Sequence, residues 1–173
     1  MRLLIINIVR FIFLILIQIN VFNNIELGFL SSYISSIIYI SFIFTLPVNI
    51  SKYGVLIIAF LLGLSLDVFQ DTYGIHASAC VFLALIRPRL LEVFNSESID
   101  KAKELTIFSV DRQKYITYVF LLTISFFLWL FLLEEFSFSR IPLILIKTVL
   151  STVISTLLII IGQILLFRNS IKK

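Results

Sequence analysis

The most constraining feature of this sequence is a series of apolar runs nearly as long as a lipid bilayer is thick. Six runs can be read, at residues 3–22, 29–46, 54–69, 75–91, 116–133 and 142–167. About 20 helical residues cross a hydrocarbon core of about 30 Å. Hydrophobic residues make up 60% of the chain, and its mean hydropathy is +1.12. We therefore expect a single all-α integral membrane domain, folded as a compact bundle of six transmembrane helices.

The third and fourth runs are the shortest, and each reaches spanning length only when polar positions are included. The third continues past Asp67, and the fourth continues past Pro88, where its apolar character stops abruptly. A single re-entrant hairpin over both runs is the alternative, and it places both flanks on the same side of the membrane. The sequence leaves both interpretations open.

The basic residues favour one orientation of these runs. Eleven of the 14 Lys and Arg residues fall in segments that share a side with both termini, whereas only Arg140 falls on the opposite side. Lys and Arg accumulate in cytoplasmic loops, so we expect both termini and the loop at residues 92–115 to be cytoplasmic. Within that loop, Ile99, Ala102 and Leu105 recur at helical spacing, which predicts an amphipathic helix on the inner membrane surface. A solvated loop is the alternative.

Polar residues inside the apolar runs indicate faces that contact protein rather than lipid. We expect Arg10 to face other helices, and Lys147 to reach towards the nearer interface. The last run carries two adjacent polar rows at helical spacing, formed by Lys147, Ser151, Ser155, Thr148, Thr152 and Thr156. Ordinary helix packing is the simpler interpretation of such rows, and a polar cavity or partner groove is the alternative.

The residues best suited to chemistry or to docking lie around the joint between the third and fourth runs. Asp67 and Asp71 are four positions apart, so they would share one face of a continuing helix. Gly74 permits a left-handed turn. One interpretation is a solvated turn that caps two helices, in which the carboxylates are simply the polar groups at the helix ends. The other is docking, in which Asp67 pairs with Arg10, Lys147 or a basic group on a partner.

The same region holds no recognisable catalytic arrangement. Two carboxylates and His76, with no second histidine or cysteine ligand beside them, make a weak metal site. The only cysteine, Cys80, lies in an apolar run. We therefore expect no metal, no cofactor, no catalytic residue and no nucleic-acid partner. Arg87 and Arg89 are expected to act as anchors near anionic lipid headgroups, with contact to a cytoplasmic partner as the alternative.

One spaced set of residues spans the third and fourth runs and comprises Gly63, Asp67, Asp71, Gly74 and His76, followed by Arg87, Pro88 and Arg89. In this spacing, G-x-x-x-D-x-x-x-D-x-x-G-x-H, the set resembles the MreD family of rod shape-determining proteins. The specific part of the resemblance covers residues 62–90, and chain length and topology agree with it over the whole chain. The loop after Arg89 departs from the family, because it is longer and more charged.

The resemblance implies a non-enzymatic scaffold of the bacterial inner (plasma) membrane, which helps to control cell shape and peptidoglycan synthesis within the rod or elongation complex. Its implied partners are the bitopic protein MreC and, more loosely, MreB, the RodA–penicillin-binding-protein synthase and membrane lipid. The residues expected to dock a partner or a neighbouring helix are Gly63, Asp67, Asp71, Gly74, His76, Arg87, Arg89, Arg10 and Lys147.

The resemblance also implies an architecture similar to the substrate-binding subunits of energy-coupling-factor transporters. The alternative function is therefore a small solute-binding membrane subunit of a transporter. Such subunits use alanine-rich helix faces to couple to an energising module. This chain has five alanines and none in its first run, which argues against transport.

Overall fold

The computed structural model describes residues 2–21, 34–48, 50–94, 105–136 and 140–167, and these residues contain helices and no strand. Five helices are long, and α2 is a single short turn of helix. Their bounds are α1 (Arg2–Asn20), α2 (Ser41–Thr45), α3 (Lys52–Gln70), α4 (Ile75–Val93), α6 (Arg112–Glu135) and α7 (Ile141–Phe167). The all-helical class expected from the sequence is confirmed for the described residues.

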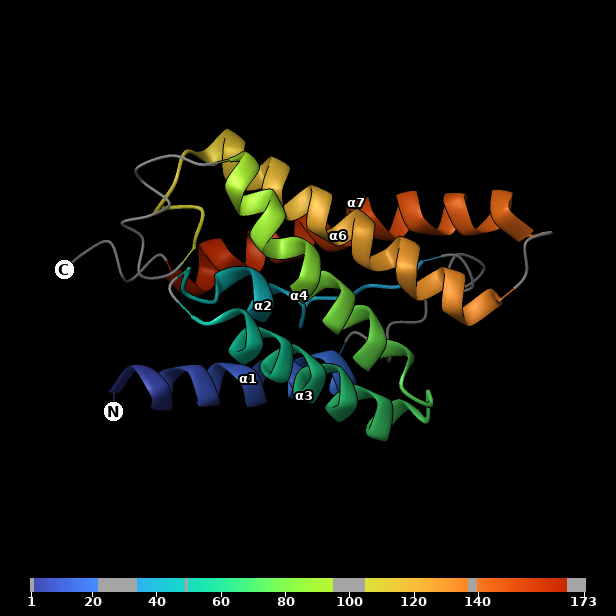
Figure 1. The fold of residues 1–173 in the computed structure, drawn as a ribbon, viewed down its shortest axis with the longest axis horizontal. Coiled ribbons are helices and arrows are strands. Elements are labelled where there is room, and N and C mark those ends of the chain that lie inside the picture. The colour runs from blue at the N-terminus through green and yellow to red at the C-terminus, as the bar shows by residue number, and fades with distance from the viewer. Residues whose placement is uncertain (1, 22–33, 49, 95–104, 137–139, 168–173) are drawn as a thin grey trace.

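The long helices lie roughly along the long axis of the molecule, with α1, α3 and α6 running in one direction and α4 and α7 in the other (Figure 1). The start of α1, the end of α4 and the start of α6 lie at one end. The α3–α4 turn and the end of α6 lie at the other end. Helix α3 packs against α4, α4 against α6, and α6 against α7, while α1 packs against α3. The fully buried aromatic side chains of Tyr39, Phe44, Tyr115, Phe126 and Phe127 fill the centre.

Three helices are long and apolar enough to cross a membrane: α3, α6 and the stretch Ile141–Leu165 of α7. Helix α1 contributes a shorter apolar stretch, Asn7–Asn20, among the residues searched. Many of the large apolar side chains on these helices point away from the protein, including Ile57, Leu157 and Leu165. Exposed apolar surface on this scale is typical of a protein surrounded by lipid.

The hydropathy pattern located most helices, and local residues explain several of their ends. Asp111 precedes α6, and its side chain accepts a hydrogen bond from the Gln113 N–H at 3.3 Å. Pro142 occupies the first turn of α7, where a missing N–H costs nothing. Helix α4 continues through Pro88 to Val93, close to the expected end at residue 91. The amphipathic helix expected around residue 99 lies outside the described residues, apart from Leu105, which is buried.

The prediction of a helix over residues 29–46 is wrong for the part that the structure describes. Residues 34–38 are not helical, a turn follows at Tyr39 and Ile40, and only Ser41–Thr45 form α2. Serine and β-branched isoleucine dominate this segment, and both are poor helix formers because serine competes for backbone hydrogen bonds and isoleucine loses rotamer freedom. Hydropathy alone did not reveal this preference.

Other helices supply the hydrogen bonds that this non-helical segment lacks. The N–H groups of Ser35 and Ile37 donate to the hydroxyls of Ser151 and Ser155 on α7, each at 3.0 Å. The Gln18 side chain on α1 accepts from the N–H of residue 38 at 2.9 Å and donates to the carbonyl of residue 36 at 3.0 Å. Non-helical backbone at membrane depth is stable only when protein satisfies it in this way. The serines of the polar row on α7 therefore serve internal packing.

Candidate functional site: the acidic hairpin and the α3–α4 groove

The acidic hairpin is the joint between α3 and α4, and Gly63 and Asp67 hold it together. A Cβ atom on Gly63 would lie 2.4 Å from the Cα of Ala77, so only glycine allows the two helices to approach this closely. One turn further along α3, the Asp67 carboxylate accepts hydrogen bonds from the N–H groups of His76 and Ala77, at 3.0 and 2.8 Å. It also accepts from the Thr72 hydroxyl at 2.5 Å.

These contacts make Asp67 a cap for α4, although it belongs to the preceding helix. The first N–H groups of a helix have no partner within it, and they carry the positive end of the helix dipole. A carboxylate accepts hydrogen bonds from these N–H groups and also interacts favourably with the positive end of the dipole. Asp67 is only 6% exposed, and its three hydrogen bonds stabilise the charge there. The structure does not bring Asp67 to Lys147, which was one of the pairings expected from the sequence, because Lys147 contacts Glu135.

The turn between the two helices uses left-handed backbone at three positions. Asp71, Tyr73 and Gly74 have φ values of 54°, 43° and 91°. The left-handed turn expected at Gly74 is confirmed. Because α3 ends at Gln70, Asp71 leaves the helix and does not share a face with Asp67. The Asp71 and Tyr73 side chains are exposed at this end of the molecule.

His76 is buried, and its ring ties α4 to the non-helical segment. The Tyr39 hydroxyl and the Nδ1 atom of His76 are 2.9 Å apart, and Tyr39 is fully buried. Cys80 lies one turn further along α4 and is also fully buried. The His76 side chain thus has a partner inside the protein, and its backbone N–H belongs to the Asp67 cap.

The two arginines of α4 have different surroundings. Arg87 is 3% exposed and donates from Nη2 to the carbonyl oxygen of Leu46, directly after α2. The expectation that Arg87 anchors the chain at lipid headgroups is therefore wrong, because the side chain points into the protein. Arg89 is exposed, as the expectation requires.

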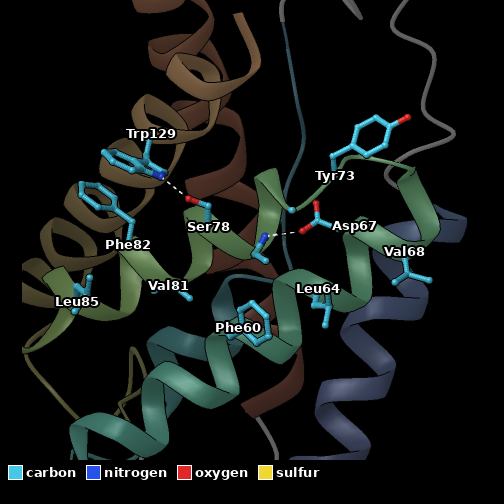
Figure 2. Close-up of a pocket in the computed structure, with 12 residues that line it drawn as sticks. Phe60, Leu64, Asp67, Val68, Tyr73, Ser78, Val81, Phe82, Leu85 and Trp129 are labelled. Atoms are coloured by element: carbon cyan, nitrogen blue, oxygen red, sulfur yellow. Dashed lines mark hydrogen bonds between the residues drawn. The ribbon is translucent and has the colours of Figure 1, made fainter. Parts of the chain in front are cut away.

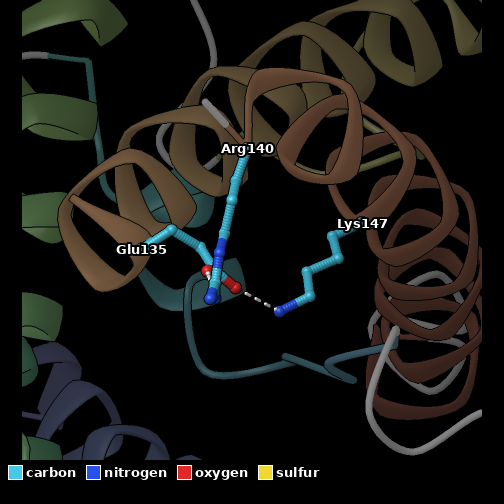
Figure 3. A network of polar contacts seen from close by, with 3 residues as sticks. All are labelled: Glu135, Arg140 and Lys147. Atoms are coloured by element: carbon cyan, nitrogen blue, oxygen red, sulfur yellow. Dashed lines mark hydrogen bonds and ion pairs between the residues drawn. The ribbon is translucent and has the colours of Figure 1, made fainter. Parts of the chain in front are cut away.

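Lys147 reaches the end of α6, and Arg10 is half-buried in the helical body. The Glu135 carboxylate at the end of α6 contacts Nζ of Lys147 at 2.7 Å and Nη1 of Arg140 at 2.9 Å (Figure 3). This network ties the end of α6 to the first turns of α7. Arg10 is half-buried and lines a small cavity of about 20 Å³ together with Gln163 of α7.

An apolar groove of about 810 Å³ runs along the outer face of the hairpin, and the sequence did not reveal it. Figure 2 shows Phe60 and Leu64 on one wall, and Val81, Leu85 and Trp129 on the other. The indole N–H of Trp129 donates to the Ser78 hydroxyl at 3.0 Å, and its ring stacks on Phe82 at 4.3 Å between centroids. Three small residues line the end of the groove that is nearest to the α3–α4 turn: Gly74, Ala77 and Ser78.

The groove suits packing against another helix better than chemistry. Small residues let a second backbone approach closely, and the walls are almost entirely apolar. Its one carboxylate, Asp67, is already engaged by the N-terminus of α4. Among the described residues, no group of three histidine, cysteine or acidic side chains is placed to hold a metal ion. The small residues Gly74, Ala77 and Ser78 indicate a site of close helix approach, but no sequence signal shows that Trp129 of α6 closes the groove.

Fold and site together define an all-helical protein with the features of a membrane protein, built around a tightly closed helical hairpin. Comparison with protein-family models, with curated proteins and with solved structures finds no match to this chain.

Proposed function

We propose that this chain is a non-enzymatic scaffold of the bacterial inner membrane, which binds the transmembrane helix of a bitopic partner in the α3–α4 groove. The groove is the observation that carries the proposal. It is long, apolar and lined by small residues at one end, and the rigid capped hairpin fixes its two walls relative to each other. A preformed surface of this kind loses little conformational freedom when a helix binds.

The partner that we propose is MreC, because the spaced set from Gly63 to Arg89 resembles the MreD family. In this arrangement the chain would belong to the rod or elongation complex, which controls cell shape and peptidoglycan synthesis. MreB and the RodA–penicillin-binding-protein synthase would associate with this chain more loosely, through MreC. The role that we assign to Gly63, Asp67 and Gly74 is to build the groove, while Val81, Leu64 and Trp129 contact the partner.

In the orientation that we propose, the chain crosses the membrane six times and both termini are cytoplasmic. Five crossings are the long helices, and the sixth is the segment from residue 34 to α2. The acidic turn at residues 71–74 then faces the periplasm. The proposal is supported by the basic residues at 112 and 114, which lie at the opposite end from that turn.

The test is to fill the groove without disturbing the hairpin. Val81 is half-buried and lines the groove, so Val81→Trp would occupy the space of the partner helix. Val153 on α7 is 46% exposed and lies outside the groove, so Val153→Trp is the matched control. We expect Val81→Trp to lose co-purification with MreC in detergent and to widen the cells, while the control retains both.

Equal recovery of MreC with both variants would exclude the groove as the binding surface. A purified chain that retained a small solute with sub-micromolar affinity, and no MreC, would instead favour the transporter subunit.

A further inference from the structure

A second pocket, of about 350 Å³, lies between the start of α3 and the end of α4. This volume falls within the range of about 300–1,000 Å³ that is typical of small-molecule sites. The pocket is at the opposite end of the hairpin from the acidic turn. Lys52 contributes to it from the first position of α3, and Arg89 and Glu92 contribute from the last turns of α4.

The charges in this pocket are of both signs. Lys52 and Arg89 are cationic, Glu92 is anionic, and all three side chains are exposed. In the described part of the chain, neither cation forms an ion pair with Glu92. The N-terminus of α3 adds partial positive charge beside Lys52. The pocket therefore offers two cations to an anionic group and one carboxylate to a cationic group.

Pro88 leaves one backbone carbonyl of α4 without its usual helical donor. Proline has no N–H, so the carbonyl of Ala84, four residues earlier in α4, lacks its usual helical donor. Both Ala84 and Pro88 line the pocket. The exposed acceptor that this pocket offers to a hydrogen-bond donor is the Glu92 carboxylate.

The surroundings of the pocket favour a position at the level of lipid headgroups. Leu56 and Leu85 also line it, and Leu85 is 53% exposed towards the outside of the helical body. Tyr53, in the first turn of α3, is 80% exposed. Exposed tyrosine is enriched where a membrane protein meets the interface between lipid and water.

We propose that this pocket binds the headgroup of a phospholipid that carries both a phosphate and a primary ammonium group. The phosphate lies between Lys52 and Arg89. The ammonium group donates to the Glu92 carboxylate, and the acyl chains follow Leu56. The inference requires only that the chain is in a membrane, and it does not depend on what occupies the α3–α4 groove.

The experiment measures lipid retention by the full chain in detergent with native mass spectrometry. Phosphatidylethanolamine carries both groups, phosphatidylglycerol lacks the ammonium group, and phosphatidylcholine has a quaternary ammonium group without N–H donors. Loss of a hydrogen bond to a charged group changes affinity by about tenfold or more. We therefore expect phosphatidylethanolamine to be retained about tenfold better than phosphatidylcholine.

Two variants separate the two halves of the headgroup. Arg89→Gln should lower retention of both phosphatidylethanolamine and phosphatidylglycerol. Glu92→Gln should lower retention of phosphatidylethanolamine and leave phosphatidylglycerol unchanged. Arg112→Gln is the matched control, because Arg112 is exposed at the same end of the molecule but does not line the pocket, and it should change neither.

Equal losses in Arg89→Gln and Arg112→Gln would overturn the proposal, since they would show unspecific attraction to a basic surface. Equal retention of phosphatidylethanolamine and phosphatidylcholine by the unmodified chain would also overturn it. Displacement of the lipid by millimolar inorganic phosphate would identify a site for the free anion instead. Because no partner protein is present, failure here leaves the proposed scaffold function untouched.

Discussion

Asp67 and Asp71 show how one turn of helix gives two identical side chains different roles. Asp67 is 6% exposed and accepts three hydrogen bonds, two of them from the first turn of α4. Asp71 is exposed and has a φ of 54°, so it ends α3 with left-handed backbone. The first residue stabilises the joint between two helices, and the second only permits the turn.

Replacing Asp67 with Asn should therefore destabilise the protein far more than the same change at Asp71. The asparagine side chain has one acceptor oxygen, so one N–H of α4 loses its partner and the charge at the helix terminus is lost. We expect Asp67→Asn to lower the free energy of unfolding by about 1–3 kcal/mol. Asparagine tolerates left-handed backbone, so Asp71→Asn should change it by less than about 0.5 kcal/mol.

Thermal unfolding in detergent, followed by circular dichroism, measures this difference. Similar midpoints for the two variants would contradict the capping role of Asp67.

At this scale the sequence predicted the turn but not the surroundings of its side chains. Gly74 indicated positive φ because glycine adopts it at little cost. The burial of Asp67 depends on where the turn places Ala77, ten residues later, and no local pattern encodes that position. The groove was beyond prediction for the same reason, because Trp129 and Ser78 are 51 positions apart.

The element that departs most from expectation is the segment at residues 34–38. Its apolar character matches a membrane helix, yet its hydrogen bonds go to α1 and α7. The other five runs became helices, in which the backbone hydrogen bonds stay within one segment. The sequence could not show that the second run is not helical. The hydroxyl that accepts from the Ile37 N–H belongs to Ser155, which is 118 positions further along the chain.

Two neighbouring residues on α7 test whether this segment depends on side-chain acceptors. Ser155→Ala leaves the buried N–H of Ile37 without a partner, which should cost about 1–3 kcal/mol. The Thr152 hydroxyl is fully buried and has no hydrogen-bond partner among the described residues, so the nearly isosteric Thr152→Val should be neutral or slightly stabilising.

Hydrogen–deuterium exchange at residues 35–38 provides the second measurement. Exchange should become faster in Ser155→Ala and stay unchanged in Thr152→Val. Equal protection in both variants would show that the α7 hydroxyls do not hold the segment.

At the scale of the whole molecule, polar and charged groups mark its two ends. The acidic turn at residues 71–74 lies at one end, and the start of α6, with Arg112 and Lys114, lies at the other (Figure 1). The Glu135 network ties α6 to α7 beside the first end. Lys and Arg in the segments flanking membrane helices favour the cytoplasm, so this asymmetry supports the orientation that we propose.

Cysteine labelling tests the orientation directly. Tyr73 and Arg112 are exposed at opposite ends, and Cys80 is the only native cysteine and is buried. In a Cys80→Ala background, Tyr73→Cys should react with a membrane-impermeant maleimide in intact spheroplasts. Arg112→Cys should react only after the membrane is opened. The reverse pattern would invert the proposed topology.

The hydrogen bonds of residues 34–38 also set the order in which this protein can be completed during synthesis. The acceptors on Ser151 and Ser155 leave the ribosome more than a hundred residues after the N–H groups that need them, at sequence separations of 116 and 118. Until then the insertion machinery or water must shield that stretch of backbone, because lipid cannot. A nascent chain truncated before residue 151 should consequently be recognised and degraded as incomplete.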